Sequence, residues 1–336
     1  MTEWFVYEGD GRPDPDKIRR LPDPPPWRAF DAEPVAYDVP DVDSSTLRRL
    51  GATAVPLPVQ DERALHLVNA ALYLRRPMLV TGDPGAGKST LAHELAYELG
   101  LGRVLEWPVV SRSELKDGLY TYDAIGRLHD AQLDRGGAGA TSEDIGRYIK
   151  LGPLGTALLA ADRPRVLLID ELDKSDIDLP NDLLNVLEEG RFAIPELERI
   201  ADHAPEVSVL TDDGRRVVVT GGVVRCRAFP VVVLTSNRER EFPTPLLRRC
   251  ITLDLQSPRD QRLAALVQAH FGEGAYEAHH DIVDLFTESG TDGALRPTDQ
   301  LLNAIFLTQY TAREQTPAQR TEIAELLMRP LDHEVR

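Results

Sequence analysis

Cysteine is nearly absent from this chain of 336 residues, which has only Cys226 and Cys250. Two isolated thiols cannot build a disulfide framework or a thiolate metal site, so we expect both to be small buried residues. Long apolar runs are also missing, and the N-terminus lacks the basic start and apolar core of a signal peptide. We therefore expect a globular protein that stays in the cytoplasm and does not insert into a membrane.

Basic residues are scarce relative to acidic ones. The chain has 38 Lys and Arg against 55 Asp and Glu, a formal net charge of -17. Such a surface repels the phosphates of nucleic acids, and no basic run with interleaved aromatic residues offsets that repulsion. The composition therefore argues against a nucleic-acid partner and favours a protein partner.

Proline is plentiful at the start of the chain. Residues 1–58 hold ten of the 25 prolines and show no sustained helical or strand period. We expect this N-terminal extension either to wrap over the surface of the protein or to be partly disordered. Its apolar anchors would be Trp4, Phe5, Tyr7 and Trp27.

The most informative segment is the glycine loop GDPGAGKST at residues 82–90. It follows the apolar run 78–81 and precedes a helical pattern at 91–99, which is the strand, loop and helix context of a phosphate-binding loop. Backbone N–H groups and the helix N-terminus would hold the phosphates of ATP. Lys88 would reach the terminal phosphates, and Ser89 would hold Mg²⁺. The predicted cradle is Gly82, Asp83, Pro84, Gly85, Ala86, Gly87, Lys88, Ser89 and Thr90.

Two carboxylates end a second apolar run, at residues 164–171. An almost wholly apolar run is typical of a strand buried on both faces, and ligands bind at the carboxyl ends of such strands. We predict that Asp170 contacts Mg²⁺ and that Glu171 is the general base for the attacking water. The competing interpretation, a surface acidic cluster, predicts no apolar strand in front of the pair.

Strands alternate with helices up to about residue 256, and only helical patterns follow. A strand at 231–236 ends at Asn237, and the last strand is expected at 251–255. A turn at 212–214 predicts a hairpin between strands at 207–210 and 217–220. The fold class is therefore α/β with a parallel sheet, divided into an extension at 1–58, an α/β domain at 59–256 and a helical domain at 257–336.

These motifs, in this order, resemble the AAA+ ATPases, particularly the MoxR-like and dynein-related branch. The resemblance covers about residues 55–330 and implies the strand order 5-1-4-3-2 and a small all-helical lid. It also implies a ring, most simply a hexamer, that remodels a protein partner, with a von Willebrand factor A-type client as one possibility. The glycine-rich insertion near 136–139 and the hairpin resemble the two inserts of the MoxR-like branch.

The resemblance assigns roles to four further residues. Asn237 would be the sensor 1 residue that orients water, although asparagine is also a common turn residue. Arg249, or Arg248 beside it, would be the arginine finger that reaches a neighbour's γ-phosphate, although surface cations are the simpler alternative. Arg296 would be the sensor 2 arginine of the lid.

Two aromatic residues and two histidines carry weaker signals. Tyr120 and Tyr122 share one face of a strand, for which core packing is favoured over partner contact. His279 and His280 are expected on a solvated helix face, since two histidines without a third ligand are weak evidence for zinc.

Three other classes of function remain open from the sequence. A nucleic-acid motor of a restriction or defence type would be stimulated by DNA or RNA. A phosphate-loop kinase would act as a monomer on a small acceptor, and a nucleotide-gated scaffold would turn over slowly. The cofactors predicted for the favoured ATPase are ATP and Mg²⁺.

Overall fold

Five parallel strands form the central sheet of the computed structural model, which describes residues 4–51, 62–133, 142–258, 260–289, 297–311 and 317–328. The predicted α/β class with a parallel sheet is confirmed. The strands lie in the order β11-β1-β10-β5-β2, which reads 5-1-4-3-2 when these five are numbered along the chain. Their bounds are β1 Met78–Gly82, β2 Leu105–Pro108, β5 Val166–Asp170, β10 Val231–Ser236 and β11 Ile251–Leu255.

The register of the central sheet brings three chain segments to one edge. Thr81 of β1 pairs with Ser236 of β10, and Leu234 of β10 pairs with Ile169 of β5. The glycine loop, the end of β5 and the end of β10 therefore emerge side by side at the carboxyl edge of the sheet. This is the edge where open α/β sheets bind their ligands.

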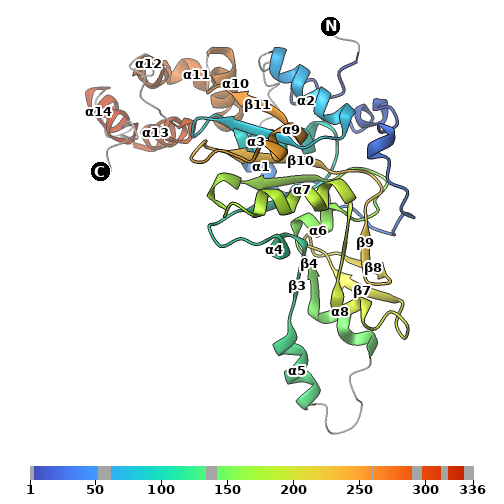
Figure 1. Cartoon of the computed structure of the whole chain (residues 1–336). Helices are drawn as coiled ribbons and strands as arrows, with labels where there is room; N and C mark the ends of the chain where they lie inside the picture. The colour runs from blue at the N-terminus through green and yellow to red at the C-terminus, as the bar shows by residue number, and fades with distance from the viewer. Residues whose placement is uncertain are drawn as a thin grey trace.

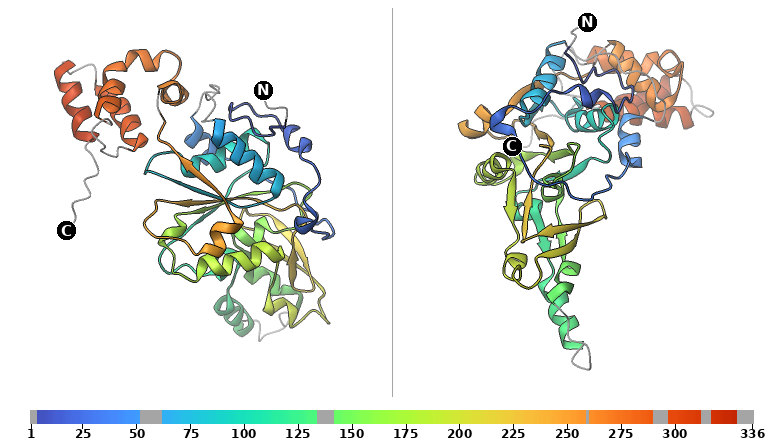
Figure 2. Two further views of the ribbon diagram at one scale, coloured as in Figure 1. Left: turned by 45° about the horizontal axis from the view of Figure 1, so that its top comes forward. Right: turned by 90° about the vertical axis from the view of Figure 1, so that its right-hand side faces the viewer.

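Helices cover both faces of the central sheet (Figure 2, left). Because neighbouring strand residues point to opposite faces, Met78 and Val80 pack in one apolar cluster while Leu79 packs in the other. The first cluster includes α2 Glu62–Leu74 and α3 Lys88–Glu98. The second includes α6 Pro153–Ala157, α7 Leu179–Glu189, α8 Pro195–Glu198 and α9 Thr244–Arg249.

A second sheet, in the order β3-β4-β7-β8, joins the strands on either side of the glycine-rich insertion, β3 and β4, to the predicted hairpin. The glycine-rich residues 136–139 themselves lie outside the described residues. The joint is a parallel pairing in which Lys150 of β4 faces Leu210 of β7. Helix α5 projects from this sheet, away from the central one (Figure 1). The elements of this region are α4 Leu115–Leu119, β3 Tyr120–Tyr122, α5 Ala124–Leu133, η3 Ser142–Tyr148, β4 Ile149–Leu151, β7 Glu206–Leu210 and β8 Arg216–Thr220. A separate pair, β6 Arg191–Ala193 with β9 Val223–Arg225, and the short η4 Leu172–Lys174 complete the body.

The N-terminal segment, residues 4–51, is more ordered than its sequence predicts. It contains η1 Lys17–Arg20, η2 Pro26–Arg28 and the helix α1 Ser44–Leu50. Helix α1 has no apolar stripe; the Asp43 side chain caps it by accepting from Thr46 N at 3.1 Å. Tyr7 is fully buried, but Trp27 is 76% exposed, so its predicted role as an anchor is wrong.

The helical tail lies beside the body (Figures 1 and 2), and its described residues form five helices. Their apolar residues form a cluster of their own, which includes Leu263, Ile282 and Leu301. His279 is buried in the tail, which corrects the expectation of a solvated histidine pair; His280 is exposed. The helices are α10 Asp260–Phe271, α11 Ala275–Ala278, α12 His280–Ser289, α13 Thr298–Thr311 and α14 Pro317–Leu327.

Candidate functional site

The glycine loop turns tightly between β1 and α3. Gly82 and Gly85 both have positive φ, of 148° and 80°, in backbone regions that L side chains rarely adopt. A Cβ on Gly85 would also lie 2.6 Å from the Cα of Pro297, in the helical tail. The glycines therefore permit both the turn and the close approach of the tail.

Lys88 is the first residue of α3 and is almost fully buried. Its Nζ donates to the carbonyl oxygens of Gly82 and Asp83, at 2.8 and 2.9 Å. Burial lowers the pKa of Lys88, although the carboxylates of Asp170 and Asp83 oppose this effect. The ammonium thus lies folded over the loop that would hold phosphates.

Ser89, Asp170 and Thr235 meet at the carboxyl edge of the sheet. Asp170 Oδ1 accepts from the Ser89 hydroxyl and from the Thr235 hydroxyl, both at 2.6 Å. Thr235 is buried on β10, which lies between β5, the strand of Asp170, and β1, the strand that leads into the glycine loop and Ser89. An oxygen-rich corner of this kind, with one carboxylate and one hydroxyl from the phosphate loop, suits Mg²⁺.

Glu171 follows Asp170 in a left-handed conformation, with φ of 59°. Its N–H donates to Thr235 Oγ1 at 2.8 Å, which helps to hold this uncommon backbone geometry. Its side chain is 42% exposed and accepts from Lys174 Nζ at 2.7 Å. The carboxylate is therefore at the surface of the cleft, where water can reach it.

Asn237 comes directly after β10, and its side chain lines the same cleft. Its backbone N–H donates to the buried Asp173 at 2.9 Å, and the N–H of Glu239 donates to the same carboxylate oxygen at 3.0 Å. Asp173 thus fixes the backbone on both sides of Arg238. Asn237 is held by this turn beside the carboxylates of β5.

A cleft of about 510 Å³ joins these groups. The helical tail forms one wall, and the Thr298 hydroxyl at the start of α13 donates to Gly85 O at 2.9 Å. The N-terminal segment contributes Arg48 and Arg49 of α1. The body contributes Pro84, Gly85, Ala86, Gly87, Lys88, Ser89, Thr90, Glu94, Asp170, Glu171, Thr235 and Asn237, and the tail contributes Arg262, Leu266, His270, Thr298, Asp299 and Leu302.

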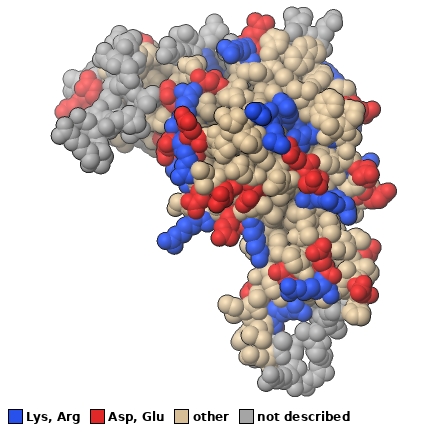
Figure 3. Space-filling view, viewed as in Figure 1, with Lys and Arg blue, Asp and Glu red and all other residues tan. Residues whose placement is uncertain are grey.

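Two of the predicted arginines lie away from this cleft. Arg248 and Arg249 end α9, which leads into β11, and Ile251 of β11 pairs with Met78 at the start of β1. They are therefore at the edge of the sheet opposite the glycine loop. Arg249 forms an ion pair with Glu188 of α7. Figure 3, viewed as Figure 1, shows Lys and Arg side chains on the surface around α9.

Arg296 lies outside the described residues, so its predicted role is untested by the structure. The residue after it, Pro297, is buried and contacts Gly85 of the phosphate loop. The predicted residues 84–90 of the loop line one cleft together with Asp170, Glu171 and Asn237. Gly82 and Asp83 do not line it; their carbonyl oxygens accept from Lys88 Nζ.

Sequence reasoning missed several residues of the cleft. Thr235 lies in an unbroken apolar strand, and its contact with Asp170 follows only from the strand order. Arg262 belongs to a helical pattern with no motif, and Thr298 lies two residues after Arg296 in the segment that resembles sensor 2 but was given no role of its own. Arg49 lies in a segment for which no helix was expected. The only local indication of that helix in the sequence is the pair Asp43-Ser44, which is typical of a helix start.

Comparison with known families bears directly on this geometry. The model of the AAA domain (dynein-related subfamily) matches residues 77–250, which is more than half of the chain. This chain belongs to the AAA family. The AAA match begins just before β1 and ends just after α9, so it includes the glycine loop, both carboxylates and Asn237. The predicted AAA+ membership and dynein-related branch are confirmed, whereas the MoxR-like branch remains a prediction.

One solved structure to which the chain is similar is a distant relative. The crystal structure of NtrX from Brucella abortus in complex with ADP is 15% identical, with a TM-score of 0.41. The similarity covers 81% of this AAA chain and 55% of that chain, so this chain spans about half the length of NtrX. No curated protein matches the chain. The functional assignment therefore depends on the residues of the cleft.

The structure also places the two cysteines and Tyr120. Cys226 and Cys250 are both buried, as predicted, and burial raises the pKa of each thiol to about 12. Tyr120 is buried and stacks on Phe192, which confirms core packing for that residue. Within the described residues, no group of three or more His, Cys, Asp or Glu could hold a metal. Nor does any helix there have the length and apolar character needed to cross a membrane.

Proposed function

We propose that this AAA protein binds ATP in the cleft and hydrolyses it as part of an oligomeric ring, most simply a hexamer. The work of the ring would be to remodel or activate a protein partner, as in a MoxR-like chaperone. The observation that carries the nucleotide assignment is the convergence of Lys88, Ser89 and Asp170 at one edge of the sheet. Two separate motifs, 81 residues apart, supply one phosphate and metal site.

Mg²⁺ fits the oxygen corner at Ser89 and Asp170. Ser89 Oγ and Asp170 Oδ1 lie 2.6 Å from each other, and Mg²⁺ prefers hard oxygen ligands of this kind. When bound, the ion would neutralise charge on the β- and γ-phosphates. Lys88 would leave the loop carbonyls and donate to the terminal phosphates, where its charge is most useful.

The hydrolytic step follows from the positions of two residues beside that corner. Water attacks the γ-phosphorus, and the bond to the bridging oxygen breaks with its electron pair remaining on ADP. Glu171 is the side chain that accepts the proton of the attacking water. Asn237, fixed through the Asp173 turn, orients that water.

The arginines of α9 would act on a neighbouring subunit. Arg248 and Arg249 lie at the opposite edge of the sheet, so they cannot reach the phosphates held by their own chain. In the proposed ring, that edge of one subunit would face the nucleotide of the next. An arginine there would stabilise the charge that develops during phosphoryl transfer.

The helical tail would act as a lid. Its contact with the phosphate loop is direct, because Thr298 donates to Gly85 and Pro297 packs against the same residue. A nucleotide in the cleft would touch both the body and the tail, so its hydrolysis would change how the two are held together. Arg296, as sensor 2, would report the nucleotide state from this side.

The two inserts support the assignment to a MoxR-like branch. The strands that flank the glycine-rich insertion and the two strands of the hairpin form a single sheet, from which α5 projects away from the central sheet (Figure 1). The net charge of -17 favours a protein partner over nucleic acid. None of the described residues supports a von Willebrand factor A-type client, and the proposal does not include one.

The Glu171→Gln variant, loaded with MgATP, tests this function. It should bind ATP without turnover and hold both the ring and its client, which a pull-down from native lysate would recover. Lys88→Met is the matched control, because it should fail to load nucleotide. Release of the captured protein by EDTA and nucleotide removal is expected. A Glu171→Gln protein that stays monomeric with MgATP would contradict the ring, and stimulation of wild-type turnover by DNA would contradict the protein client.

A further inference from the structure

Glu94 joins three parts of the chain. It lies on α3, six residues after Lys88, and its carboxylate is almost fully buried at the wall of the cleft. Glu94 Oε2 accepts from the Tyr7 hydroxyl of the N-terminal segment at 3.0 Å. Glu94 Oε1 accepts from Arg262 Nη2 of the helical tail at 2.9 Å. The phosphate-loop helix, the N-terminal segment and the tail therefore meet at one carboxylate.

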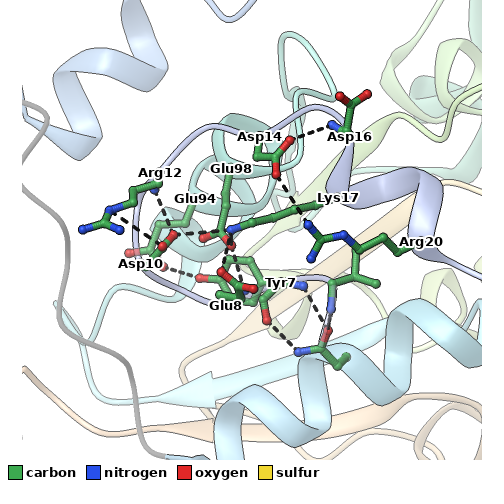
Figure 4. Close-up of polar contacts among 12 residues, drawn as sticks. Tyr7, Glu8, Asp10, Arg12, Asp14, Asp16, Lys17, Arg20, Glu94 and Glu98 are labelled. Carbon is green, nitrogen blue, oxygen red and sulfur yellow. Dashed lines mark hydrogen bonds and ion pairs between the residues drawn. The ribbon is translucent and has the colours of Figure 1, made fainter. Parts of the chain in front are cut away.

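The N-terminal side of this junction is firmly docked (Figure 4). Tyr7 is fully buried, and burial together with the charges of Glu94 and Glu98 raises the pKa of its hydroxyl, so Tyr7 remains a donor. The backbone N–H groups of Val6 and Tyr7 both donate to Asn69 Oδ1, at 2.8 and 3.0 Å.

A buried ion pair strengthens the same docking. Lys17 Nζ lies 3.0 Å from both Glu8 and Glu98, and Glu98 is on α3 one turn beyond Glu94. Burial disfavours the charged lysine, but the hydrogen bonds to Glu8 and Glu98 outweigh it and raise the pKa of Lys17. The N-terminal segment is thus attached to the helix that follows the phosphate loop.

The tail side of the junction faces the cleft. Arg262, Leu266 and His270 are spaced by four residues on α10, so they share one helix face, and all three line the cleft. A guanidinium has five N–H donors in a fixed planar arrangement. One edge of Arg262 can therefore remain on Glu94 while another donates to a bound anion.

We propose that Arg262 is a nucleotide-binding residue supplied by the helical tail, and that Glu94 and Tyr7 position it. The proposal rests on nucleotide binding in the cleft, as inferred above. Tyr7 holds Glu94, Glu94 holds Arg262, and Arg262 contacts the nucleotide. Because each link orients the next, nucleotide binding and docking of the N-terminal segment strengthen each other, and such coupling is reciprocal.

The experiment compares Tyr7→Phe with Tyr73→Phe. Both remove one hydroxyl that ties the N-terminal segment to the body, since the Tyr73 hydroxyl donates to Trp4 O at 2.8 Å. Only Tyr7 reaches Glu94. MgADP and MgATP affinities are measured by titration calorimetry. Amide hydrogen exchange of the peptide that contains Val6 and Tyr7 is measured with and without nucleotide.

In wild type and in Tyr73→Phe, nucleotide should slow exchange at Val6 and Tyr7 about fivefold, at the low end of ordinary coupling between sites. Tyr7→Phe should lose this protection and bind nucleotide about fivefold more weakly. Arg262→Ala should bind about tenfold more weakly and show no protection. Because it also leaves the buried Glu94 carboxylate without its guanidinium partner, its affinity is measured well below its own melting temperature.

The outcomes separate this proposal from the nucleotide assignment. If wild type binds no nucleotide, the proposed function itself is wrong. If wild type binds nucleotide but Tyr7→Phe behaves like Tyr73→Phe in both affinity and exchange, the positioning of Arg262 through Glu94 is wrong. Unchanged affinity in Arg262→Ala would likewise overturn it.

Discussion

Ser89 Oγ lies 2.6 Å from Asp170 Oδ1, although the two residues are 81 positions apart in the chain. The same carboxylate oxygen accepts from Thr235, so its direction is set by two hydroxyl groups. One of these belongs to the phosphate loop and the other to the central strand of the sheet. The geometry orients Asp170 toward the phosphate loop before any nucleotide arrives.

Thr235→Val should impair both stability and turnover. The substitution keeps the branched shape but removes the hydroxyl that donates to Asp170 and accepts from Glu171 N–H. Leaving buried groups without partners should lower the free energy of unfolding by about 1–3 kcal/mol. ATP turnover should fall at least tenfold, because the catalytic carboxylates lose their orientation. Urea denaturation and a phosphate-release assay would measure the two effects.

Thr81→Val is the matched control for that change. Thr81 lies on the adjacent strand β1, and its hydroxyl contacts Asp254 at 3.4 Å rather than a catalytic carboxylate. Its turnover should remain within about twofold of wild type. Equal loss of turnover in both variants would mean that Thr235 has no special role in the site.

Glu171→Gln should stop hydrolysis while nucleotide binding persists. The amide cannot accept a proton from water, and removal of a general base typically costs about 10²–10⁴ in rate. The affinity for MgATP should stay within about threefold of wild type, since the side chain is at the cleft surface. Single-turnover hydrolysis and equilibrium titration separate the two quantities.

Lys88→Met provides the opposite pattern. It should lose nucleotide binding, because the ammonium that pairs with the phosphates is gone. Thermal unfolding in the presence of MgATP would reveal this as a missing upward shift in melting temperature. Normal turnover in Glu171→Gln would mean that another residue is the base.

His93 should make the protein sensitive to mild acid. Its ring is fully buried on α3, where Nδ1 lies 2.9 Å from the Thr46 hydroxyl of α1. Burial, with a contribution from the charge of Arg49, lowers the pKa of His93 to about 4. In the unfolded chain the pKa of His93 is near 6.5. Between about pH 6.5 and 4 the unfolded chain therefore binds a proton at His93 that the folded chain does not bind.

The sign of the pH effect follows directly. Above about pH 6.5 the contribution of His93 to stability is constant, and between about pH 6.5 and 4 it falls as the pH falls. The total loss amounts to about 3 kcal/mol. Urea unfolding at a series of pH values would show this slope, which His93→Gln should remove. A slope that persists unchanged in that variant would assign it to other groups.

The sequence predicts those parts of the site whose residues lie within one short, continuous motif. Lys88 and Ser89 sit in one uninterrupted motif, and Asp170 ends an apolar strand, so each can be placed without knowing the rest of the fold. Thr235 could not be placed, because its role depends on β10 lying between β1 and β5. Sequence alone does not give that neighbour relation without the family resemblance.

The N-terminal segment illustrates the second limit. Tyr7 was expected to be an apolar anchor, and it is buried, but its hydroxyl bond to Glu94 links positions 87 apart. The sequence did not predict helix α1, because this helix has no apolar stripe. It contacts α3 through a polar contact between Thr46 and His93. Long-range polar contacts of this kind leave no periodic signal in the sequence.

The shared site is the central claim, and mixing two inactive variants tests it most directly. The Arg248→Ala/Arg249→Ala double variant keeps an intact nucleotide cleft but lacks the arginines offered to its neighbour. Glu171→Gln keeps those arginines but lacks the base. Randomly mixed one to one in a ring, the two should regain about a quarter of wild-type ATP turnover, because that share of clefts combines an intact base with intact arginines. A mixture that forms rings yet stays inactive, or a double arginine variant that hydrolyses ATP at the wild-type rate as a monomer, would contradict the account.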